Sequence, residues 1–247
     1  MINLVVTGTG RCGTTYLAKL LTSLHYFCGH ESIFNYEDEE IIKKRLLNKD
    51  YTLSICSQST ANVRFHEDKM NWVNLDEIKA DSSYMAAPYL NWKELSNIKI
   101  IHLYRNPLDV IRSFVHDLDY FSKNHPNEKN IYNELGFEQK IWKFLPLLSD
   151  IDNQLERACY FYVEWNKLIT KNCKNKKVLE IKIEDDDKIQ KIKKFINIKE
   201  NFDYFDDKKE NTRNIKNKKI KLKEIPSGKI KDKIIEIMFE KKYLCMI

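Results

Sequence analysis

Glycine and proline are scarce in this chain of 247 residues, which contains six glycines and five prolines. Flexible linkers between domains are rich in these residues, so their scarcity favours one domain over residues 1–247. No apolar run reaches the length of about 18 residues that a membrane-spanning helix needs, so we expect no integral membrane association. The N-terminus enters an apolar strand directly, which argues against a signal peptide and predicts a cytoplasmic protein.

Paired cysteines are also lacking. The six cysteines are scattered, without a C-x-x-C pair or a spacing typical of zinc ligands, so we expect reduced thiols. The net charge of +6 is concentrated in the C-terminal third of the chain. It suits either an anionic ligand or an ordinary lysine-rich surface. No nucleic-acid motif and no interleaved aromatic residues accompany the lysines, so no nucleic-acid partner is predicted.

Residues 2–24 carry the pattern strand, glycine-rich turn, helix. The first residues form a short apolar run rich in β-branched side chains, which is typical of a strand buried on both faces. Gly8, Gly10 and Gly13 interrupt this run, and leucines at helical spacing follow over residues 14–24. In such a layout the backbone N–H groups of the turn converge on an anion beside the positive end of the helix dipole. The stretch therefore predicts a phosphate-binding loop.

The loop departs from the nucleoside-triphosphate motif G-x-x-x-x-G-K-[ST] at one informative position. Gly8 and Gly13 have the required spacing, and Thr15 occupies the Ser/Thr position. Thr14, however, replaces the lysine that NTPases place on the β- and γ-phosphates, and the cation of the loop is Arg11. These residues argue against an ordinary NTPase.

A second strand–turn–helix pattern occupies residues 98–115. The apolar run ends at Arg105, and Pro107 follows at a position that the first turn of a helix favours. A Walker B strand would end in an aspartate that binds magnesium, whereas an arginine offers a fork for an oxyanion. Helix geometry can bring the hydroxyl of Ser113 toward the same site.

Together, the stretches GTGRCGTTYL and LYRNPLDVIRSF resemble the sulfotransferases that use 3′-phosphoadenosine 5′-phosphosulfate (PAPS). The resemblance implies a P-loop, NTPase-like α/β fold with a mainly parallel sheet flanked by helices. It also implies PAPS as the sulfuryl donor and transfer without a metal ion. The residues that it assigns to the donor are Gly10, Arg11, Cys12, Gly13, Thr14, Thr15, Arg105 and Ser113.

Two residues of the predicted loop receive a more specific interpretation. Arg11 is expected to stabilise the charge that builds on the bridging oxygen as the sulfuryl group leaves. The thiol of Cys12 could have its pKa lowered at the helix N-terminus. We favour the simpler interpretation, in which Cys12 is a small residue filling a serine-like position.

The candidate general base follows the first predicted helix. Residues 26–28 predict a second short strand, after which Gly29, His30 and Glu31 turn the chain. Ligands bind beyond the carboxyl ends of parallel strands, so these side chains are expected to face the site. Transfer to a hydroxyl needs a base, and the resemblance implies a glutamate just past the first helix. We predict Glu31 as the base, with His30 as the alternative base or a substrate contact. An ordinary solvated turn is the competing interpretation.

Three further segments carry open alternatives. Asp81 and Ser83 either contact the acceptor or assist the base, or one of them caps a following helix. The acidic run 184–187 either holds a metal or begins a helix, and we favour the helix because negative charge stabilises its N-terminus. By resemblance, Arg213 lies in a basic loop over the 3′-phosphate of the donor, and a solvated basic loop is the alternative.

The predicted activity is sulfuryl transfer from PAPS to a hydroxyl or amine of a small-molecule or glycan acceptor. A divergent P-loop kinase or NTPase is one alternative, and a non-catalytic nucleotide-binding module is another. No pattern in the sequence indicates which acceptor is used, because the variable segments set that choice. None indicates the oligomeric state either.

Overall fold

The computed structural model describes residues 2–35, 38–48, 78–118, 120–122, 137–198 and 219–244. The chain divides into two compact units, each described by itself below. The first unit comprises Met1–Tyr104 and Ile169–Thr212, and the second comprises Arg105–Leu168 and Arg213–Ile247.

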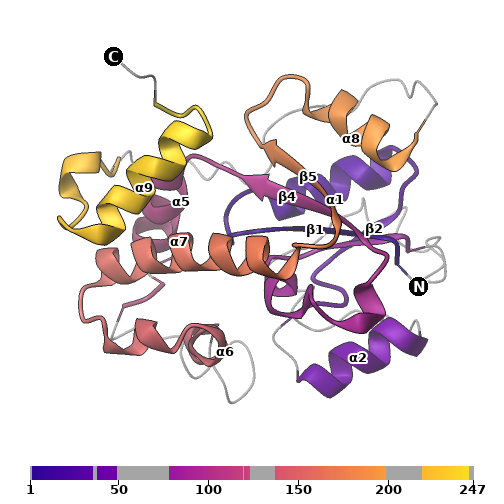
Figure 1. The fold of residues 1–247 in the computed structure, drawn as a ribbon, viewed down its shortest axis with the longest axis horizontal. Coiled ribbons are helices and arrows are strands. Elements are labelled where there is room, and N and C mark those ends of the chain that lie inside the picture. The colour runs from indigo at the N-terminus through magenta and orange to yellow at the C-terminus, as the bar shows by residue number, and fades with distance from the viewer. Residues whose placement is uncertain are drawn as a thin grey trace. The chain divides into compact units, whose positions relative to one another are not determined.

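The first unit is built on a parallel sheet with the strand order β2-β3-β1-β4-β5. Each of the four strand pairings is parallel. The strands are β1 (Leu4–Gly8), β2 (Cys28–His30), β3 (Ala80–Ser82), β4 (Lys99–Tyr104) and β5 (Lys177–Lys182). This sheet confirms the predicted α/β class (Figure 1).

Helices cover the sheet of the first unit. They are α1 (Thr14–Ser23), α2 (Glu39–Asn48) and α8 (Lys188–Ile196), with 3-10 turns at Tyr84–Tyr89 and Lys93–Leu95. Leu17 and Leu20 of α1, Ile192 of α8 and Ile101 of β4 are buried in one apolar cluster. The leucine spacing that predicts α1 therefore provides the face that packs against the sheet.

The second strand differs from its prediction. The apolar residues 26–28 predict a strand that ends before Gly29, whereas β2 comprises Cys28–His30. Gly29 and His30 are in the strand because they pair with Asp81 and Ser82 of β3. Pairing with a distant segment thus outweighs the local turn signal of glycine and histidine.

The carboxyl ends of the parallel strands gather at one edge of the sheet. β1 ends at Gly8, which pairs with Leu103 of β4, and β2 ends at His30, which pairs with Ser82 of β3. β1 lies between β3 and β4, so the chain builds the sheet outward on both sides of β1. Ligands of open α/β sheets bind beyond the strand ends at such a switch point. The loop after β1 occupies this position.

The second unit is helical in the part that the structure describes. It contains α5 (Pro107–Arg112), a π-helix (Ser113–Asp117), α6 (Phe137–Phe144), a 3-10 turn (Pro146–Asp150) and most of α7 (Gln154–Asn172). A 3-10 turn (Leu222–Glu224) and α9 (Lys229–Glu240) follow near the C-terminus.

Aromatic side chains form the core of the second unit. The ring of Phe161 lies 5.2 Å from each of the rings of Phe114, Phe121 and Trp165, measured between centroids. Trp165 is fully buried. Arg157 is buried beside this core, and its guanidinium donates to the carbonyl of Phe121 at 2.9 Å.

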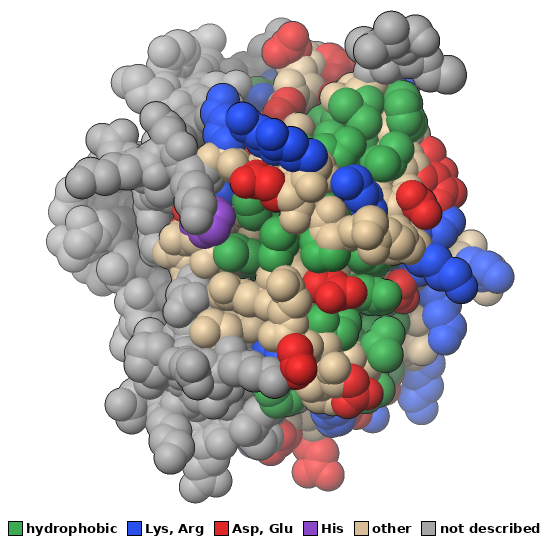
Figure 2. Space-filling view, turned by 90° about the vertical axis from the view of Figure 1, so that its left-hand side faces the viewer, with side chains coloured by type: hydrophobic (Ala, Val, Ile, Leu, Met, Phe, Trp, Pro, Cys, Tyr) green, Lys and Arg blue, Asp and Glu red, His purple; other side chains and the backbone are tan. Residues whose placement is uncertain are grey.

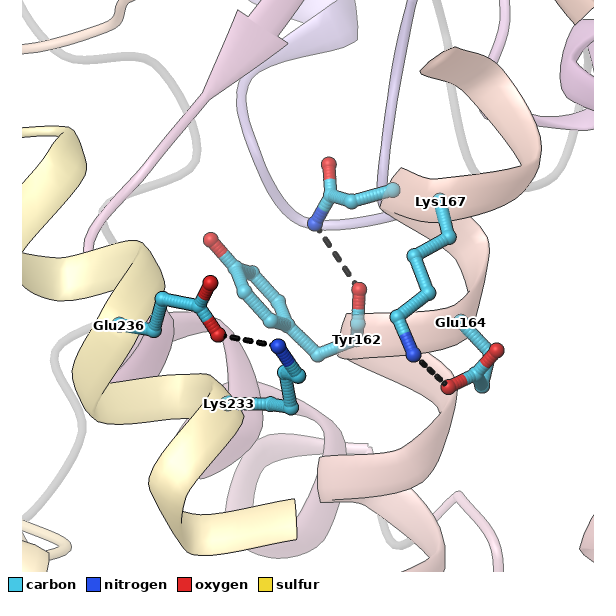
Figure 3. A network of polar contacts seen from close by, with 6 residues as sticks. Tyr162, Glu164, Lys167, Lys233 and Glu236 are labelled. Carbon is cyan, nitrogen blue, oxygen red and sulfur yellow. Dashed lines mark hydrogen bonds and ion pairs between the residues drawn. The ribbon is translucent and has the colours of Figure 1, made fainter. Parts of the chain in front are cut away.

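α7 and α9 each carry an ion pair between residues three apart in the chain. Lys167 pairs with Glu164 at 2.6 Å, and Lys233 pairs with Glu236 (Figure 3). On the face drawn in Figure 2, acidic and basic side chains are interspersed with hydrophobic ones. Within the described ranges, no helix combines the length and the apolar character that crossing a bilayer requires.

Candidate functional site

The loop between β1 and α1 has a backbone that requires glycine at two places. A Cβ on Gly8 would lie 2.4 Å from the carbonyl oxygen of Leu103 and 2.6 Å from the sulfur of Cys12. Gly13 has a φ of 106°, and a Cβ there would lie 2.9 Å from Cδ1 of Ile183. Arg11 also adopts a positive φ of 67°. The loop is therefore tightly held against β4 and the residue after β5, as a preformed anion cradle must be.

The start of α1 is compatible with an anion. Its N-cap residue is Gly13, which has no side chain and so cannot itself cap the first N–H groups of the helix. An anion in the loop could satisfy such groups and would lie at the positive end of the helix dipole. Gly10 lies in the turn before it, and Cys12 is fully buried, consistent with the role of a small filler.

His30 lies at the end of β2 and joins the start of α1. Its Nε2 is 3.3 Å from Oγ1 of Thr14 and 3.1 Å from Oγ1 of Thr15. The ring is buried, and Nδ1 has no hydrogen-bond partner within the described residues. Burial, assisted by the positive charge of Lys19, lowers the pKa of His30 to about 4, so the ring is neutral at pH 7.

Glu31 follows directly and is also buried. It adopts a φ of 55°, which is uncommon for a residue with a side chain. Burial raises the pKa of its carboxyl to about 8, with a further contribution from the negative charge of Asp81. A carboxyl with such a pKa accepts a proton far more readily than an exposed glutamate does. The competing interpretation of a solvated turn does not fit this burial.

Asp81 and Ser83, the two open candidates on β3 and just after it, have different partners. The hydroxyl of Ser83 accepts a hydrogen bond from the N–H of Met85 at 3.1 Å and so caps the 3-10 turn that follows. Asp81 does not cap this turn and instead binds backbone N–H groups after β2. The predicted helix cap is therefore confirmed for Ser83.

Arg105 and Ser113 both lie in the second unit. Arg105 comes directly after β4, and its carbonyl accepts a hydrogen bond from the Tyr162 hydroxyl at 3.1 Å. Asn106 caps α5 by accepting from the N–H of Leu108 at 3.0 Å, and Pro107 stands in the first turn as predicted. Ser113 is buried where α5 passes into the π-helix. Such π-helical turns are frequent at functional sites.

The other predicted residues are placed as follows. Arg213 and the basic loop around it lie outside the described residues. Asp185 of the acidic run forms ion pairs with Lys182 and Lys191 at 3.3 and 3.2 Å. In the described part of the chain no three His, Cys, Asp or Glu side chains are grouped as metal ligands.

The sequence does not indicate two contacts that join these segments. One is the hydrogen bonding of His30 to the threonines, and the other is the hydroxyl of Ser82, which donates to the carbonyl of Thr14 at 2.8 Å. Both connect residues that the chain separates widely, and no local spacing signals such a pairing. The register of β2, β3 and β1 brings them together.

The model of the sulfotransferase domain family matches residues 2–243. A comparison with curated proteins finds no match.

Proposed function

The chain belongs to the sulfotransferase domain family and is thus an enzyme of sulfuryl transfer, and we propose that PAPS is its donor. Bound PAPS supplies an activated sulfuryl group on a 5′-phosphate, and it carries a 3′-phosphate that distinguishes it from ADP. The observation that carries the proposal is the N-terminus of α1, whose N-cap is the glycine Gly13, behind a glycine loop without the NTPase lysine. The 5′-phosphosulfate of PAPS is an anion of the kind that backbone N–H groups at a helix N-terminus bind.

Residues of the loop would bind and polarise the 5′-phosphosulfate. Gly10 and Gly13 would contribute backbone N–H groups, which converge on an anion in such turns. Cys12, whose own N–H donates to the carbonyl of Thr9 at 3.3 Å, would fill the turn beside them. Arg11, with the hydroxyls of Thr14 and Thr15, would stabilise negative charge on the bridging oxygen as the S–O bond breaks. His30 would hold the two hydroxyls, a role that its neutral ring and its distances to them support.

Glu31 would serve as the general base. The acceptor hydroxyl or amine forms the new bond to sulfur, its proton passes to the Glu31 carboxylate, and 3′-phosphoadenosine 5′-phosphate departs. The raised pKa of Glu31, about 8, supports this role, because a base works best when its pKa lies near the working pH. His30 is the weaker candidate, since its pKa is lowered to about 4.

Arg105, Ser113 and Arg213 would bind the 3′-phosphate. Arg105 offers a bidentate fork and Ser113 a hydroxyl, and both follow β4 in the order that the family resemblance implies. We propose that no metal takes part, that a small molecule or glycan is the acceptor, and that the chain works as one domain. The cytoplasmic location stays a prediction.

Calorimetric titration with 3′-phosphoadenosine 5′-phosphate, without magnesium and beside ADP and ATP, tests the donor. We expect binding of the bisphosphate and much weaker binding of ADP. Arg105→Ala should weaken the bisphosphate at least about tenfold, because hydrogen bonds between charged groups contribute about 1.5–3 kcal/mol. Lys167→Ala, which removes an exposed charge from the same unit, is the matched control and should bind as the wild type does.

Two results would contradict the proposal. Absence of binding by the bisphosphate would exclude PAPS as the donor. A preference for ATP with magnesium would favour the divergent kinase or NTPase instead. Binding that persists in Glu31→Gln together with unchanged turnover would remove Glu31 as the base but leave the donor site intact.

A further inference from the structure

The segment after β2 has three consecutive backbone N–H groups that meet a single carboxylate. Ser32, Ile33 and Phe34 donate to the carboxylate of Asp81 at 3.0, 3.4 and 3.1 Å. Converging N–H groups of this kind form an anion-binding nest. Here the chain's own Asp81 occupies the nest, so the segment is anchored rather than open to a ligand.

The two residues after Asp81 hold the same segment and the first turn of α1. The carbonyl of Ser82 accepts from the N–H of Glu31 at 3.2 Å, and its hydroxyl donates to the carbonyl of Thr14 at 2.8 Å. The hydroxyl of Ser83 donates to the carbonyl of Phe34 at 2.6 Å. Residues 81–83 therefore form hydrogen bonds both to the segment that carries Glu31 and to the first turn of α1, which borders the proposed anion site.

Close packing leaves this arrangement little freedom. A Cβ on Gly29 would lie 2.4 Å from Oγ of Ser32 and 3.0 Å from Oδ1 of Asp81. Asp81, Ser82 and Ser83 are fully buried. Hydrogen bonds to a charged acceptor in such surroundings are stronger than those between neutral groups.

We propose that Asp81 is a positioning residue, which together with Ser82 and Ser83 fixes residues 31–34 and hence the Glu31 carboxyl relative to the first turn of α1. This inference rests on the proposed role of Glu31 as the base. Of the alternatives that the sequence leaves open for Asp81 and Ser83, the proposal corresponds to assistance of the base, and it specifies positioning as the means.

Asp81 also acts on Glu31 through its charge. Burial raises the pKa of Asp81 to about 6, opposed by the three backbone hydrogen bonds and by the positive charge of Arg45 on α2. The charge of Asp81 contributes to the raised pKa of Glu31 and to that of the Cys28 thiol on β2. The same residue that holds the base in place thus favours its protonated form.

Asp81→Asn in the full chain tests both effects. Selective isotope labelling of glutamate lets NMR follow the carboxyl carbon of Glu31 during a pH titration, with Glu31→Gln identifying the signal. We expect the pKa of Glu31 to fall by about one unit because a nearby negative charge is lost. The amides of residues 32–34 should exchange with deuterium about tenfold faster or more, because their charged acceptor is gone.

Asp185→Asn is the matched control. It removes another carboxylate of the same unit that accepts a backbone N–H, from Lys182 at 3.4 Å. The titration of Glu31 and the exchange of residues 32–34 should match the wild type in this variant. An unchanged Glu31 titration and unchanged exchange in Asp81→Asn would overturn the proposal.

Ser83→Ala keeps the test decisive if Asp81→Asn does not fold. This variant retains the charge of Asp81 and removes both hydrogen bonds of the Ser83 hydroxyl, the one that it donates to Phe34 and the one that it accepts from Met85. Amide exchange at residues 32–34 should accelerate while the pKa of Glu31 stays near 8. Unaltered exchange would refute the proposal that residues 81–83 fix residues 31–34 in place. Binding of 3′-phosphoadenosine 5′-phosphate to the wild type is measured in parallel. Its absence would exclude PAPS as the donor, whereas the NMR titration and the amide exchange test the positioning role of Asp81.

Discussion

The imidazole Nε2 of His30 lies 3.1 Å from the hydroxyl oxygen of Thr15, although 15 residues separate them in the chain. The contact joins the end of β2 to the first turn of α1. It gives His30 a hydrogen-bonding role at the predicted donor site, independent of any role as a base.

The pH dependence of folding tests the environment of His30. Its pKa is about 4 in the folded state against an ordinary value of 6.5, so the unfolded chain binds the proton more readily. Stability should therefore fall as the pH drops from 6.5 to 4, by up to about 3 kcal/mol. Urea unfolding at several pH values measures this loss.

Two variants of His30 test whether this residue causes the loss of stability in acid. His30→Leu and His30→Gln should both lack this acid-dependent loss, because neither titrates. His30→Gln should be the more stable of the two at pH 7, since it offers a polar group to the threonine hydroxyls. If His30→Leu retained the full acid slope, the slope would belong to other groups.

Glu31→Gln should separate catalysis from donor binding. Loss of a general base lowers the transfer rate by about 10²–10⁴-fold, whereas binding of 3′-phosphoadenosine 5′-phosphate should be unchanged. In the wild type the rate should rise with pH until about pH 8, because Glu31 must lose its proton to act as a base. Single-turnover assays with any acceptor that the wild type uses measure both effects. A flat pH profile would argue against Glu31.

The raised pKa of Glu31 also predicts that the fold loses stability at alkaline pH. The pKa of Glu31 is raised from 4.5 to about 8, so the folded state binds the proton more tightly than the unfolded chain. This contribution to stability is complete below pH 4.5 and is lost as the pH rises through 8. Glu31→Gln should remove the part of the alkaline loss that Glu31 causes, as denaturant titrations at pH 5 and 8 would reveal.

Gly13→Ala tests the backbone of the loop. A residue with a side chain at a φ of 106°, with its Cβ 2.9 Å from Ile183, should destabilise the fold by about 1–3 kcal/mol and weaken the bisphosphate. Gly228→Ala is the control, since Gly228 has a φ of 125° but open space around it. The control should lose stability without losing affinity. Equal affinities in both variants would show that the loop is not the donor site.

Ser113→Ala tests the second motif. Removing a hydroxyl that binds a phosphate should weaken 3′-phosphoadenosine 5′-phosphate about tenfold and leave the weak binding of ADP unaltered. Ser149→Ala removes an exposed hydroxyl of the same unit, which donates to the carbonyl of Pro146, and should change neither. A parallel loss for ADP in Ser113→Ala would point to a general structural effect.

Local patterns were sufficient for the elements that carry the two motifs. The glycine spacing and the leucines predict β1, the loop and α1, because a buried strand and an amphipathic helix each have a periodicity of their own. Arg105, Asn106 and Pro107 likewise mark the end of β4 and the start of α5. The bounds of β2 were wrong by two residues, because pairing with β3 and not local propensity decides where that strand ends.

The sequence by itself determined the class of fold and the family, because the glycine-rich turn and the Arg105 motif are each signalled by residues close together in the chain. Tertiary structure alone decided what His30, Asp81 and Ser82 do, because their partners lie 15 or more residues away and meet them only through the strand register. It also decided the pKa values of His30 and Glu31, which depend on burial and on charges that only the folded chain brings near.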